Sequence, residues 1–531
     1  MIDARPDELE KVLKILQEHV PEHEVRAYGS RAKWTAWEYS DLDLVVVGDA
    51  ELDFRKLIDL RSAFEESDLR FSVDVLDWHS IPDSFRQEIA NEYVVIKDNV
   101  RSRQRPTVRL GDYIDINDST FSSKDRWPQV SYLDTGNITE NRISEVKSLS
   151  IGIDKIPARA RRKVKPGDIV YSTVRPNQRH HGLLKEVPEN MLVSTGFAVM
   201  RGKEGIADSG FVYYFLTQNH IVEHLQAIAE NSTSTYPSIK PSDIEELEIH
   251  LPPIDEQRRI AGILGSLDDK IELNRRMSQT LEEMAQALFK SWFVDFDPVQ
   301  AKSEGRGPAL PARPVDIING RFVESEVGLI PEDWRVGTLG EVAKETKSSV
   351  LPHSIASGTP YIGLAHMPKA SIALSEWNWA DHVESGKLAF RRGDILFGKL
   401  RPYFHKVGIA PIDGLCSTDI MVISPHSADT YGYLLGHVSS TMFVDYTNAS
   451  STGTRMPRTS WKVMSAYKVV IPPASVLKSF NDSICPMLDR IVANIHESFC
   501  LSNLRERLLP QLIDGKIPMA SNERLPKGSK L

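Results

Sequence analysis

Three aspartates near the start of the chain have the types and spacing of a metal site. Asp41 and Asp43 stand two residues apart at the entrance of an apolar run that ends at Val47. Residues i and i+2 of a strand point to the same face, so we expect these two carboxylates to project together. Asp74 lies in a second apolar run and is expected on a neighbouring strand. Carboxylate oxygens suit Mg²⁺ or Mn²⁺, so the three side chains predict a metal site.

A Gly-Ser pair precedes this acidic group. Gly29 stands twelve residues before Asp41 and is followed by Ser30. Backbone N–H groups at such a turn can hold phosphate, and metal ions can neutralise a triphosphate and activate an attacking oxygen. Either motif alone is weak evidence, because aspartates at strand ends are often only solvated. Their combination predicts a site that binds a nucleoside triphosphate.

The joint arrangement is Gly29-Ser30-Arg31-Ala32, then Ser40-Asp41-Leu42-Asp43-Leu44, then Asp74. Over residues 1–98 it resembles the minimal nucleotidyltransferases of the polymerase-beta superfamily. The resemblance implies that the three aspartates are catalytic and hold Mg²⁺, and that the Gly-Ser pair binds the nucleotide phosphates. Trp34 stands where many members carry a small residue. Two alternatives therefore stay open, an active transferase and a relic or binding module.

The elements that must position these residues form a small domain. Apolar spacing predicts a helix over 6–19, a strand over 42–47, a helix over 54–66 and a strand over 71–76. This order is typical of a small α/β domain.

The rest of the chain contains a long internal repeat. Residues 165–171, continued by Val174-Arg175-Pro176, return as residues 391–397, continued by Leu400-Arg401-Pro402, at an offset of 226 residues. The period is far longer than the 20 to 50 residues of stacked repeats, so it indicates duplication of a whole domain. Short β-rich runs divided by Gly and Pro dominate each copy.

Each copy ends in a long amphipathic segment. Residues 254–292 and 475–509 carry apolar side chains at coiled-coil spacing, and each helix would span roughly 50 to 60 Å. Two polar positions weaken the first seam. The expected seams comprise Ile260, Leu264, Leu267, Ile271, Asn274, Leu281, Ala285, Leu288 and Trp292 in the first helix, and Ile484, Leu488, Ile491, Ile495, Leu501, Leu504, Leu508 and Leu512 in the second. We expect an antiparallel coiled coil; core helices of one globular domain are the alternative.

Four motifs of the duplicated body resemble the specificity subunit of type I restriction-modification systems over residues 106–515. They are Gly167-Asp168-Ile169-Val170, Leu251-Pro252-Pro253-Ile254-Asp255-Glu256-Gln257, Phe293-Val294-Asp295-Phe296-Asp297-Pro298-Val299 and Gly328-Leu329-Ile330-Pro331-Glu332-Asp333-Trp334. The resemblance implies two target-recognition domains that each read half of a split double-stranded DNA site. It also implies a helical ruler that docks methyltransferase (M) subunits in a complex with restriction/translocase (R) subunits. The second helix entry, Pro472-Pro473-Ala474-Ser475-Val476, departs from the motif, so docking at the two helices need not be equal.

This body carries none of the phosphate-loop, nucleophile-elbow or zinc-protease motifs, so we expect binding without catalysis or cofactor. Its candidate DNA contacts are basic side chains. A run over 158–165 has five basic residues and no acid, and two arginines occupy equivalent positions after strands of the two copies. The predicted DNA-binding residues are Arg159, Arg161, Arg162, Arg175, Arg179, Lys399 and Arg401. The alternatives are a solvated loop for the run, and arginines that brace the domain through backbone carbonyls.

Length and composition exclude several classes of protein. The chain has 531 residues, enough for three to four domains. Its net charge of −9 excludes a uniformly basic, histone-like binder. No uncharged apolar run approaches about 20 residues and the N-terminus lacks a secretory signal, so we expect a cytoplasmic protein without a membrane span.

We therefore predict a multidomain α+β chain. Its expected parts are a nucleotidyltransferase-like domain at 1–98, a first recognition domain at 106–253, a central spacer helix at 254–297, a linker at 298–330, a second recognition domain at 331–473, a distal spacer helix at 474–515 and a tail at 516–531. The predicted function is a DNA-specificity subunit with an appended nucleotidyltransferase domain whose acceptor is unknown. The alternative is a nucleotidyltransferase related to toxin–antitoxin or defence systems that uses the duplicated body for targeting.

Overall fold

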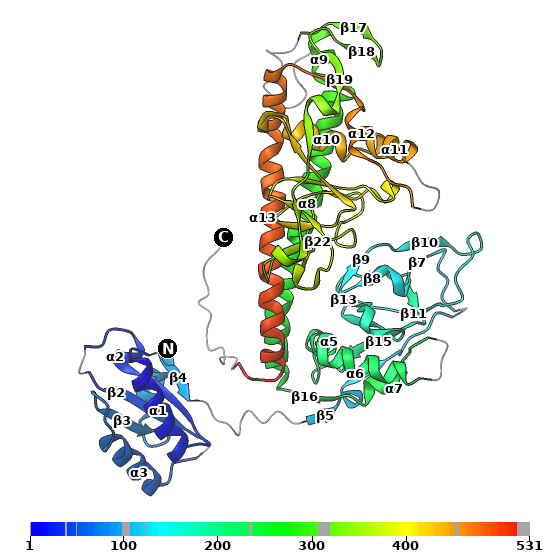
Figure 1. The fold of residues 1–531 in the computed structure, drawn as a ribbon. Helices are drawn as coiled ribbons and strands as arrows, with labels where there is room; N and C mark the ends of the chain where they lie inside the picture. Colours follow the sequence, from blue (N-terminus) through cyan, green and yellow to red (C-terminus); the bar gives the residue numbers. More distant parts are fainter. Residues whose placement is uncertain are drawn as a thin grey trace. The chain divides into compact units, whose positions relative to one another are not determined.

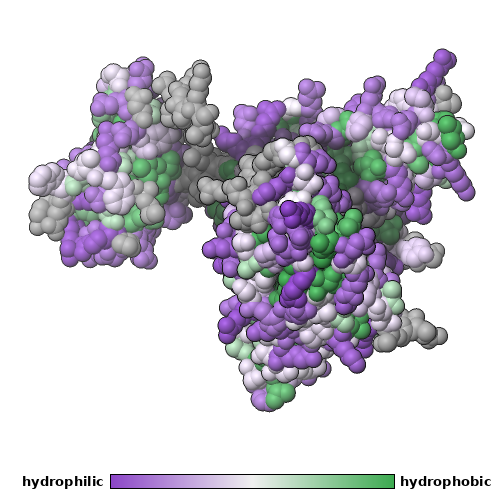
Figure 2. Space-filling model, turned by 90° about the horizontal axis from the view of Figure 1, so that it is seen from above, coloured by the Kyte–Doolittle hydropathy of each residue, from purple (hydrophilic) through white to green (hydrophobic). Residues whose placement is uncertain are grey.

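The computed structural model describes residues 2–37, 40–48, 50–97, 107–122, 124–232, 236–305, 319–451 and 456–517 (Figure 1). Contacts divide the chain into two compact units, residues 1–261 with 509–531, and residues 262–508. None of the helices in the described ranges combines the length and the apolar character needed to cross a membrane. Hydrophilic residues cover most of the surface visible in Figure 2, and apolar residues form smaller patches.

The N-terminal domain is a four-stranded sheet with the order β3-β2-β1-β4. Its elements are α1 Pro6–His19, β1 Glu24–Tyr28, α2 Gly29–Ala32, β2 Leu42–Val47, α3 Phe54–Glu65, β3 Val73–Asp77, α4 Asp83–Asn91 and β4 Val94–Lys97. The two helices and two strands expected from the sequence are confirmed, with boundaries that differ by at most two residues. The strands β1 and β4 and the helices α2 and α4 were not predicted.

Helices cover both faces of this sheet. Leu16 of α1 and Leu60 of α3 pack with Leu44 of β2 in one fully buried cluster. Val45 faces the other way and packs with Ile89 of α4 in a second cluster. Residues 44–47 of β2 form an uninterrupted apolar run because helices cover both faces of the strand, which leaves no solvent-facing side for polar residues to alternate on.

The first repeat domain, residues 107–253, contains two four-stranded sheets with the orders β10-β7-β14-β11 and β13-β12-β15-β6. Its strands and helices are β5 Thr107–Arg109, β6 Ile114–Ile116, β7 Gln129–Leu133, β8 Ile138–Thr139, β9 Arg142–Ile143, β10 Lys147–Ser150, β11 Ala160–Lys163, β12 Asp168–Ser172, β13 His181–Leu184, β14 Met191–Ser194, β15 Phe197–Gly202, α5 Ser209–Thr217, α6 Asn219–Glu230, α7 Pro241–Glu245 and β16 Glu248–His250.

The second repeat domain, residues 331–473, has the same plan. Its strands and helices are β19 Arg335–Thr338, β20 Ala343–Thr346, β21 Ser349–Val350, β22 Pro360–Ile362, β23 Asn378–Trp379, β24 Lys387–Phe390, β25 Ile395–Gly398, β26 Val407–Ile409, β27 Gly414–Cys416, β28 Ile420–Pro425, α10 Tyr431–Val438, α11 Thr441–Ala449, α12 Trp461–Ser465 and β29 Lys468–Ile471. The sheet β26-β25-β28-β20 repeats the order β13-β12-β15-β6 of the first copy. The parallel pair β22-β27 repeats β7-β14, so the duplication read from the sequence is confirmed in three dimensions.

The repeated Gly-Asp motif before the central strand has a structural role. Gly167 and Gly393 both have φ of 88°, a left-handed backbone that glycine adopts without strain. Asp168 accepts a hydrogen bond from the Lys165 amide at 2.8 Å, and Asp394 accepts one from the Arg391 amide at 2.7 Å. The motif therefore closes the turn that leads into β12 and β25.

The predicted linker over 298–330 holds secondary structure in the part that the structure describes. This part holds α9 Asp297–Ser303, β17 Phe322–Ser325 and β18 Gly328–Pro331, and residues 306–318 lie outside the described residues. Val299 of α9 is fully buried. Phe296 packs against Trp334 with ring centroids 5.5 Å apart. These apolar contacts order a segment whose Pro, Gly and Ala content suggested a connector.

Two helices of 40 residues follow the repeat domains, α8 Ile254–Phe293 and α13 Ala474–Ile513. Both predicted helices are confirmed; the second extends four residues beyond the amphipathic run over 475–509 and ends two residues before 515, the predicted limit of the distal spacer helix. The predicted seam is wrong at Leu504, which is 46% exposed. Arg505 reaches α8 instead and forms an ion pair with Asp268 at 2.8 Å, so the neighbouring Leu504 faces solvent.

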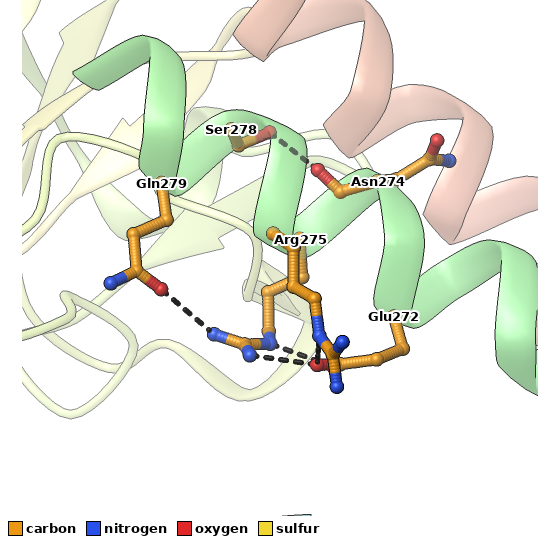
Figure 3. A network of polar contacts seen from close by, with 6 residues as sticks. Glu272, Asn274, Arg275, Ser278 and Gln279 are labelled. Atoms are coloured by element: carbon orange, nitrogen blue, oxygen red, sulfur yellow. Dashed lines mark hydrogen bonds and ion pairs between the residues drawn. The ribbon is translucent and has the colours of Figure 1, made fainter. Parts of the chain in front are cut away.

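Within residues 262–508 polar side chains join these helices. The amide Nδ2 of Asn274 donates to Glu497 at 2.9 Å, and that of Asn494 donates to Ser278 at 3.2 Å. Residue numbers rise along α8 as they fall along α13, so the helices run antiparallel. Figure 3 shows Asn274 beside α13, whereas Arg275 and Glu272 lie on another face of α8. The polar positions that were expected to weaken the seam are hydrogen-bonded across it.

The first helix entry is tied to its own repeat domain by Gln257. This fully buried side chain accepts a hydrogen bond from the Asp208 amide at 2.8 Å and donates to the carbonyl of Pro252 at 2.8 Å. Leu477 takes the equivalent position in the second copy and is buried. The motif that sequence reasoning linked to partner docking thus has a role inside the chain, and apolar packing replaces it in the second copy.

Glu282 joins α8 to the second repeat domain. Its side chain is 5% exposed and accepts hydrogen bonds from the Ser371 hydroxyl and the Ile372 amide, both at 2.8 Å. Burial raises the pKa of this carboxyl, although the two hydrogen bonds act in the opposite direction. The folded unit therefore holds a proton on Glu282 at pH values at which the unfolded chain has released it.

We expect Glu282→Gln to change the pH dependence of stability. Because the folded pKa is raised, wild-type stability should fall as pH rises from the ordinary pKa of glutamate through the raised value. The variant lacks this titration, so its melting temperature relative to wild type should increase over the same interval. Glu283→Gln, at the exposed neighbouring position, is the control. Parallel melting curves for wild type and Glu282→Gln at every pH would contradict the assignment.

Candidate functional site

The three predicted aspartates meet at one edge of the N-terminal sheet. Asp43 of β2 and Asp74 of β3 are paired in the parallel register of the two strands. Asp41 immediately precedes β2, and Tyr28 of β1 pairs with Asp43 on the other side. Asp41 and Asp74 are exposed and Asp43 is half-buried. The three side chains predicted from the sequence therefore lie at the same edge of the sheet.

The carboxylates disfavour one another's charge. Burial raises the pKa of Asp43, and the charges of Asp74 and Asp41 raise it further. Burial also raises the pKa of Tyr28 to about 12, with further contributions from Asp43 and Asp74. A divalent cation at this edge would reverse the repulsion, because it favours the charged form of every carboxylate near it.

Gly29 leaves room for the half-buried carboxylate. Its φ is 74°, and a Cβ at this position would overlap Oδ2 of Asp43. Gly29 also opens α2, the single turn of helix that carries Ser30. The predicted phosphate-binding pair therefore lies directly against the predicted metal ligand, and only glycine permits this approach.

Arg31 positions the segment that leads to Asp41, a role that sequence reasoning missed. The buried guanidinium donates from Nε to the carbonyl of Ser40 and from Nη1 to the carbonyl of Asp3, both at 2.7 Å. It also lies 4.0 Å from the ring centroid of Phe71. An arginine between a glycine turn and an aspartate pair was visible in the sequence, but its acceptors are backbone groups that no pattern indicates.

The donor set fits a divalent cation in its chemistry. All three side chains offer hard oxygen ligands. In the described ranges, however, no three acidic, histidine or cysteine side chains come close enough together to hold an ion. Asp41 instead accepts a hydrogen bond from the hydroxyl of Ser72. Binding of an ion by all three aspartates therefore requires their carboxylates to move closer together.

Trp34 follows the phosphate-binding turn. Hydrogen bonds from Lys33 N to Gly29 O at 3.2 Å and from Thr35 N to Ser30 O at 3.0 Å enclose it. Its φ is 57°, a left-handed conformation that costs a bulky residue about 1 to 2 kcal/mol. The side chain is 63% exposed, so it faces solvent rather than the core of the domain.

The basic run over 158–165 divides in the structure. Arg159 and Arg161 are exposed, as a DNA-contacting surface requires. Lys163 forms an ion pair with Asp125 and lies 5.4 Å from the ring of Trp127. Arg162 is half-buried and donates to the carbonyl of Thr195 at 3.5 Å, and burial lowers the pKa of its guanidinium. Part of the run is thus neutralised or used within the domain.

The remaining predicted DNA contacts lie in matching turns. Arg175 is exposed and precedes η3 Pro176–Gln178, and Arg401 is half-buried and precedes η8 Pro402–Phe404. Lys399 is half-buried two residues before Arg401. Arg179 differs from the two turn arginines, because it donates to Oδ1 of Asn219 at 2.6 Å and lies 3.7 Å from Glu140.

Two family models match this chain. Residues 106–283 match the type I restriction modification DNA specificity domain, and residues 10–102 match the polymerase beta nucleotidyltransferase family.

Individual proteins agree with both matches. The HindI type I restriction enzyme specificity subunit of Haemophilus influenzae is 26% identical over 459 residues, which cover 77% of this chain and 98% of that protein. The probable protein adenylyltransferase MntA of the same organism is 43% identical over 106 residues, which cover 20% of this chain and 93% of that protein. A crystal structure of a type I restriction-modification S subunit from M. genitalium gives a TM-score of 0.48 at 14% identity, covering 77% of this chain and 96% of that one.

We expect Mg²⁺ or Mn²⁺ to protect the acidic edge of the N-terminal domain. Hydrogen exchange in β2 and β3 should slow when the ion is added, because it relieves the repulsion that raises the pKa of Asp43. The protection should weaken as pH falls through that raised pKa, since protons then compete with the ion. Asp41→Asn with Asp43→Asn should abolish it, and Asp59→Asn on the exposed side of α3 should leave it intact. Equal protection in the double variant would refute a metal site here.

Proposed function

The chain belongs to the type I restriction-modification specificity subunits and carries an additional nucleotidyltransferase domain of the polymerase-beta family at its N-terminus, and from this premise we propose how its parts divide the work. The duplicated body reads a bipartite double-stranded DNA site within a complex of methyltransferase (M) and restriction/translocase (R) subunits. The N-terminal domain transfers a nucleotidyl group to an acceptor that is not yet known.

One observation carries the first assignment. Two domains that share the order of one four-stranded sheet and a parallel strand pair are each followed by a helix of 40 residues. A split DNA site needs two reading heads and a spacer of fixed length, and this architecture supplies one head and one helix per half-site. The 98% coverage of the HindI specificity subunit supports the same assignment over the whole of that protein.

We propose that α8 and α13 pair as an antiparallel coiled-coil ruler. Polar contacts between residues 268–278 of α8 and residues 494–505 of α13 support this pairing. We also propose Arg159, Arg161 and the two turn arginines as DNA contacts, because their side chains are available to phosphate.

The three-aspartate edge supports a second activity. We propose that Asp41, Asp43 and Asp74 hold Mg²⁺, which when bound neutralises the triphosphate and activates the attacking oxygen. Gly29 and Ser30 would hold the phosphates, while Arg31 keeps the approach to Asp41 in place. The 43% identity to MntA over its near-complete length favours an active domain over a relic.

Asp41→Asn with Asp43→Asn should separate the two activities. We expect the double variant to lose Mg²⁺-dependent transfer of label from a nucleoside triphosphate, because two of the proposed metal ligands lose their charge. DNA methylation by the complex reconstituted with its partner subunits should persist. Asp59→Asn is the control that should retain both activities. Loss of methylation in the folded double variant would refute this division of labour.

Lengthening both helices should change only the spacing of the DNA site. Seven residues inserted after Ser266 in α8 and seven after Arg505 in α13 add about 10 Å and preserve the heptad phase. The Asp268–Arg505 ion pair stays in register. We expect methylation mapping to return the same half-sites about three base pairs further apart. Altered half-sites at unchanged spacing would contradict the ruler.

A further inference from the structure

The two repeat domains contain one turn in the same unusual conformation. Arg175 and Arg179 in the first copy have φ of 48° and 53°, and Arg401 and His405 in the second have φ of 51° and 49°. In each copy the two left-handed residues flank a single 3-10 turn that begins with proline. Left-handed backbone is strained for side-chain-bearing residues, and such strain concentrates at functional sites.

The same backbone hydrogen bonds hold both turns. The amide of Arg175 donates to the carbonyl of Pro237 at 3.0 Å, and that of Arg401 donates to the carbonyl of Pro457 at 2.8 Å. Two residues earlier along the turn, the Thr173 and Lys399 carbonyls accept from amides of the same second loop, at 2.8 Å and 3.0 Å. Each turn is therefore fixed against a loop of its own domain.

A side chain also braces the far end of each turn. Arg179 donates to Asn219, the first residue of α6, at 2.6 Å. His405 contacts the carbonyl of Ser439, the residue after α10, at 2.8 Å. The last residue of each turn is thus anchored to a helix of its own domain, by an arginine in the first copy and by a histidine in the second. The place of this anchor is the same in the two copies, but the type of side chain differs.

The guanidinium of the arginine that opens each turn has no polar partner among the described residues. Over the described ranges, neither the Arg175 nor the Arg401 guanidinium donates a hydrogen bond or joins an ion pair. Arg175 lies 5.7 Å from the ring of Tyr236. The Nε of Arg401 is buried without a hydrogen-bond partner. A braced backbone therefore presents a guanidinium in each copy, and apart from the buried Nε of Arg401 its donors remain available for a ligand.

The side chains inside the two turns are unrelated. Asn177 and Gln178 are exposed in the first copy. The second copy has Tyr403, which is also exposed, and Phe404, which lies 5.1 Å from the ammonium group of Lys369. A side-chain amide can form two hydrogen bonds with the edge of one base, whereas an aromatic ring offers apolar contact to a thymine methyl group.

We propose that Arg175 and Arg401 are sequence-independent phosphate anchors, one per half-site, and that residues 177–178 and 403–404 read bases beside them. This inference rests on the proposed DNA-specificity function. An arginine held alike by two reading domains must contact something that any two half-sites share, and the phosphate backbone is that feature. The planar guanidinium matches phosphate with two parallel hydrogen bonds.

Binding by the reconstituted complex tests the anchors. Arg175→Ala and Arg401→Ala should each weaken binding about tenfold, equally for cognate and unrelated duplexes. Each should also reduce the slope of log affinity against log salt by about 0.9. The methylated sequence should stay unchanged. Lysine at the same position should restore part of the slope, which a purely structural role would not. Arg55→Ala, an exposed arginine of α3, is the control that should change neither quantity.

Variants at the proposed base-reading positions should change sequence preference and not the salt dependence. Asn177→Ala with Gln178→Ala should lower affinity for the cognate duplex, leave unrelated duplexes and the salt slope unchanged, and relax the motif in one half-site only. A motif altered by Arg175→Ala, or a salt slope unchanged by both arginine variants, would overturn the proposal. If the wild-type complex showed no sequence preference at all, the specificity function itself would fail, while the salt slopes would still report whether the arginines contact phosphate.

Discussion

The contact between α8 and α13 depends on polar side chains that lie among the apolar ones. Asn274 and Asn494 each donate across the helix contact, and the Asp268–Arg505 ion pair fixes the same alignment some turns away. An apolar seam tolerates sliding by a heptad, but sliding here would bury these polar groups without partners at about 1 to 3 kcal/mol each. If the two helices set the distance between the reading domains, as proposed above, these few polar contacts determine that distance.

Much of this architecture was readable from the sequence. Helices, central strands and the duplication follow from apolar periodicity, and the aspartates follow from strand alternation, because Asp43 and Asp74 fall in register on adjacent strands. The failures share a cause. The segment that holds Val299 was predicted to be a linker because its composition is loop-like, although this side chain is buried in a cluster of residues distant in sequence. Leu504 was predicted to face α8 from the spacing of apolar residues, but the neighbouring Arg505 contacts α8 through an ion pair with Asp268.

The site shows the same limit. The types of its residues were visible in the sequence, but the contacts that hold them were not, since Arg31 acts through backbone carbonyls of other segments. The repeated Gly-Asp and Arg-Pro motifs were found by comparing the copies, and only coordinates separate their roles. Asp168 and Asp394 of the Gly-Asp motifs close turns through hydrogen bonds to backbone amides. The arginines of the Arg-Pro motifs have a fixed left-handed backbone, and their guanidinium groups can contact a ligand.

The close approach of Gly29 to Asp43 has an evolutionary consequence. Every glycine codon becomes an alanine codon by a single nucleotide change, so one transversion places a methyl group where the carboxylate must lie. All three aspartates would survive such an event unaltered, and the reading domains would not be touched. Among natural relatives of this chain, the aspartates are therefore poor markers of a working N-terminal domain. Whether a relative retains glycine at the position of Gly29 is the better indicator that its N-terminal domain is still under selection.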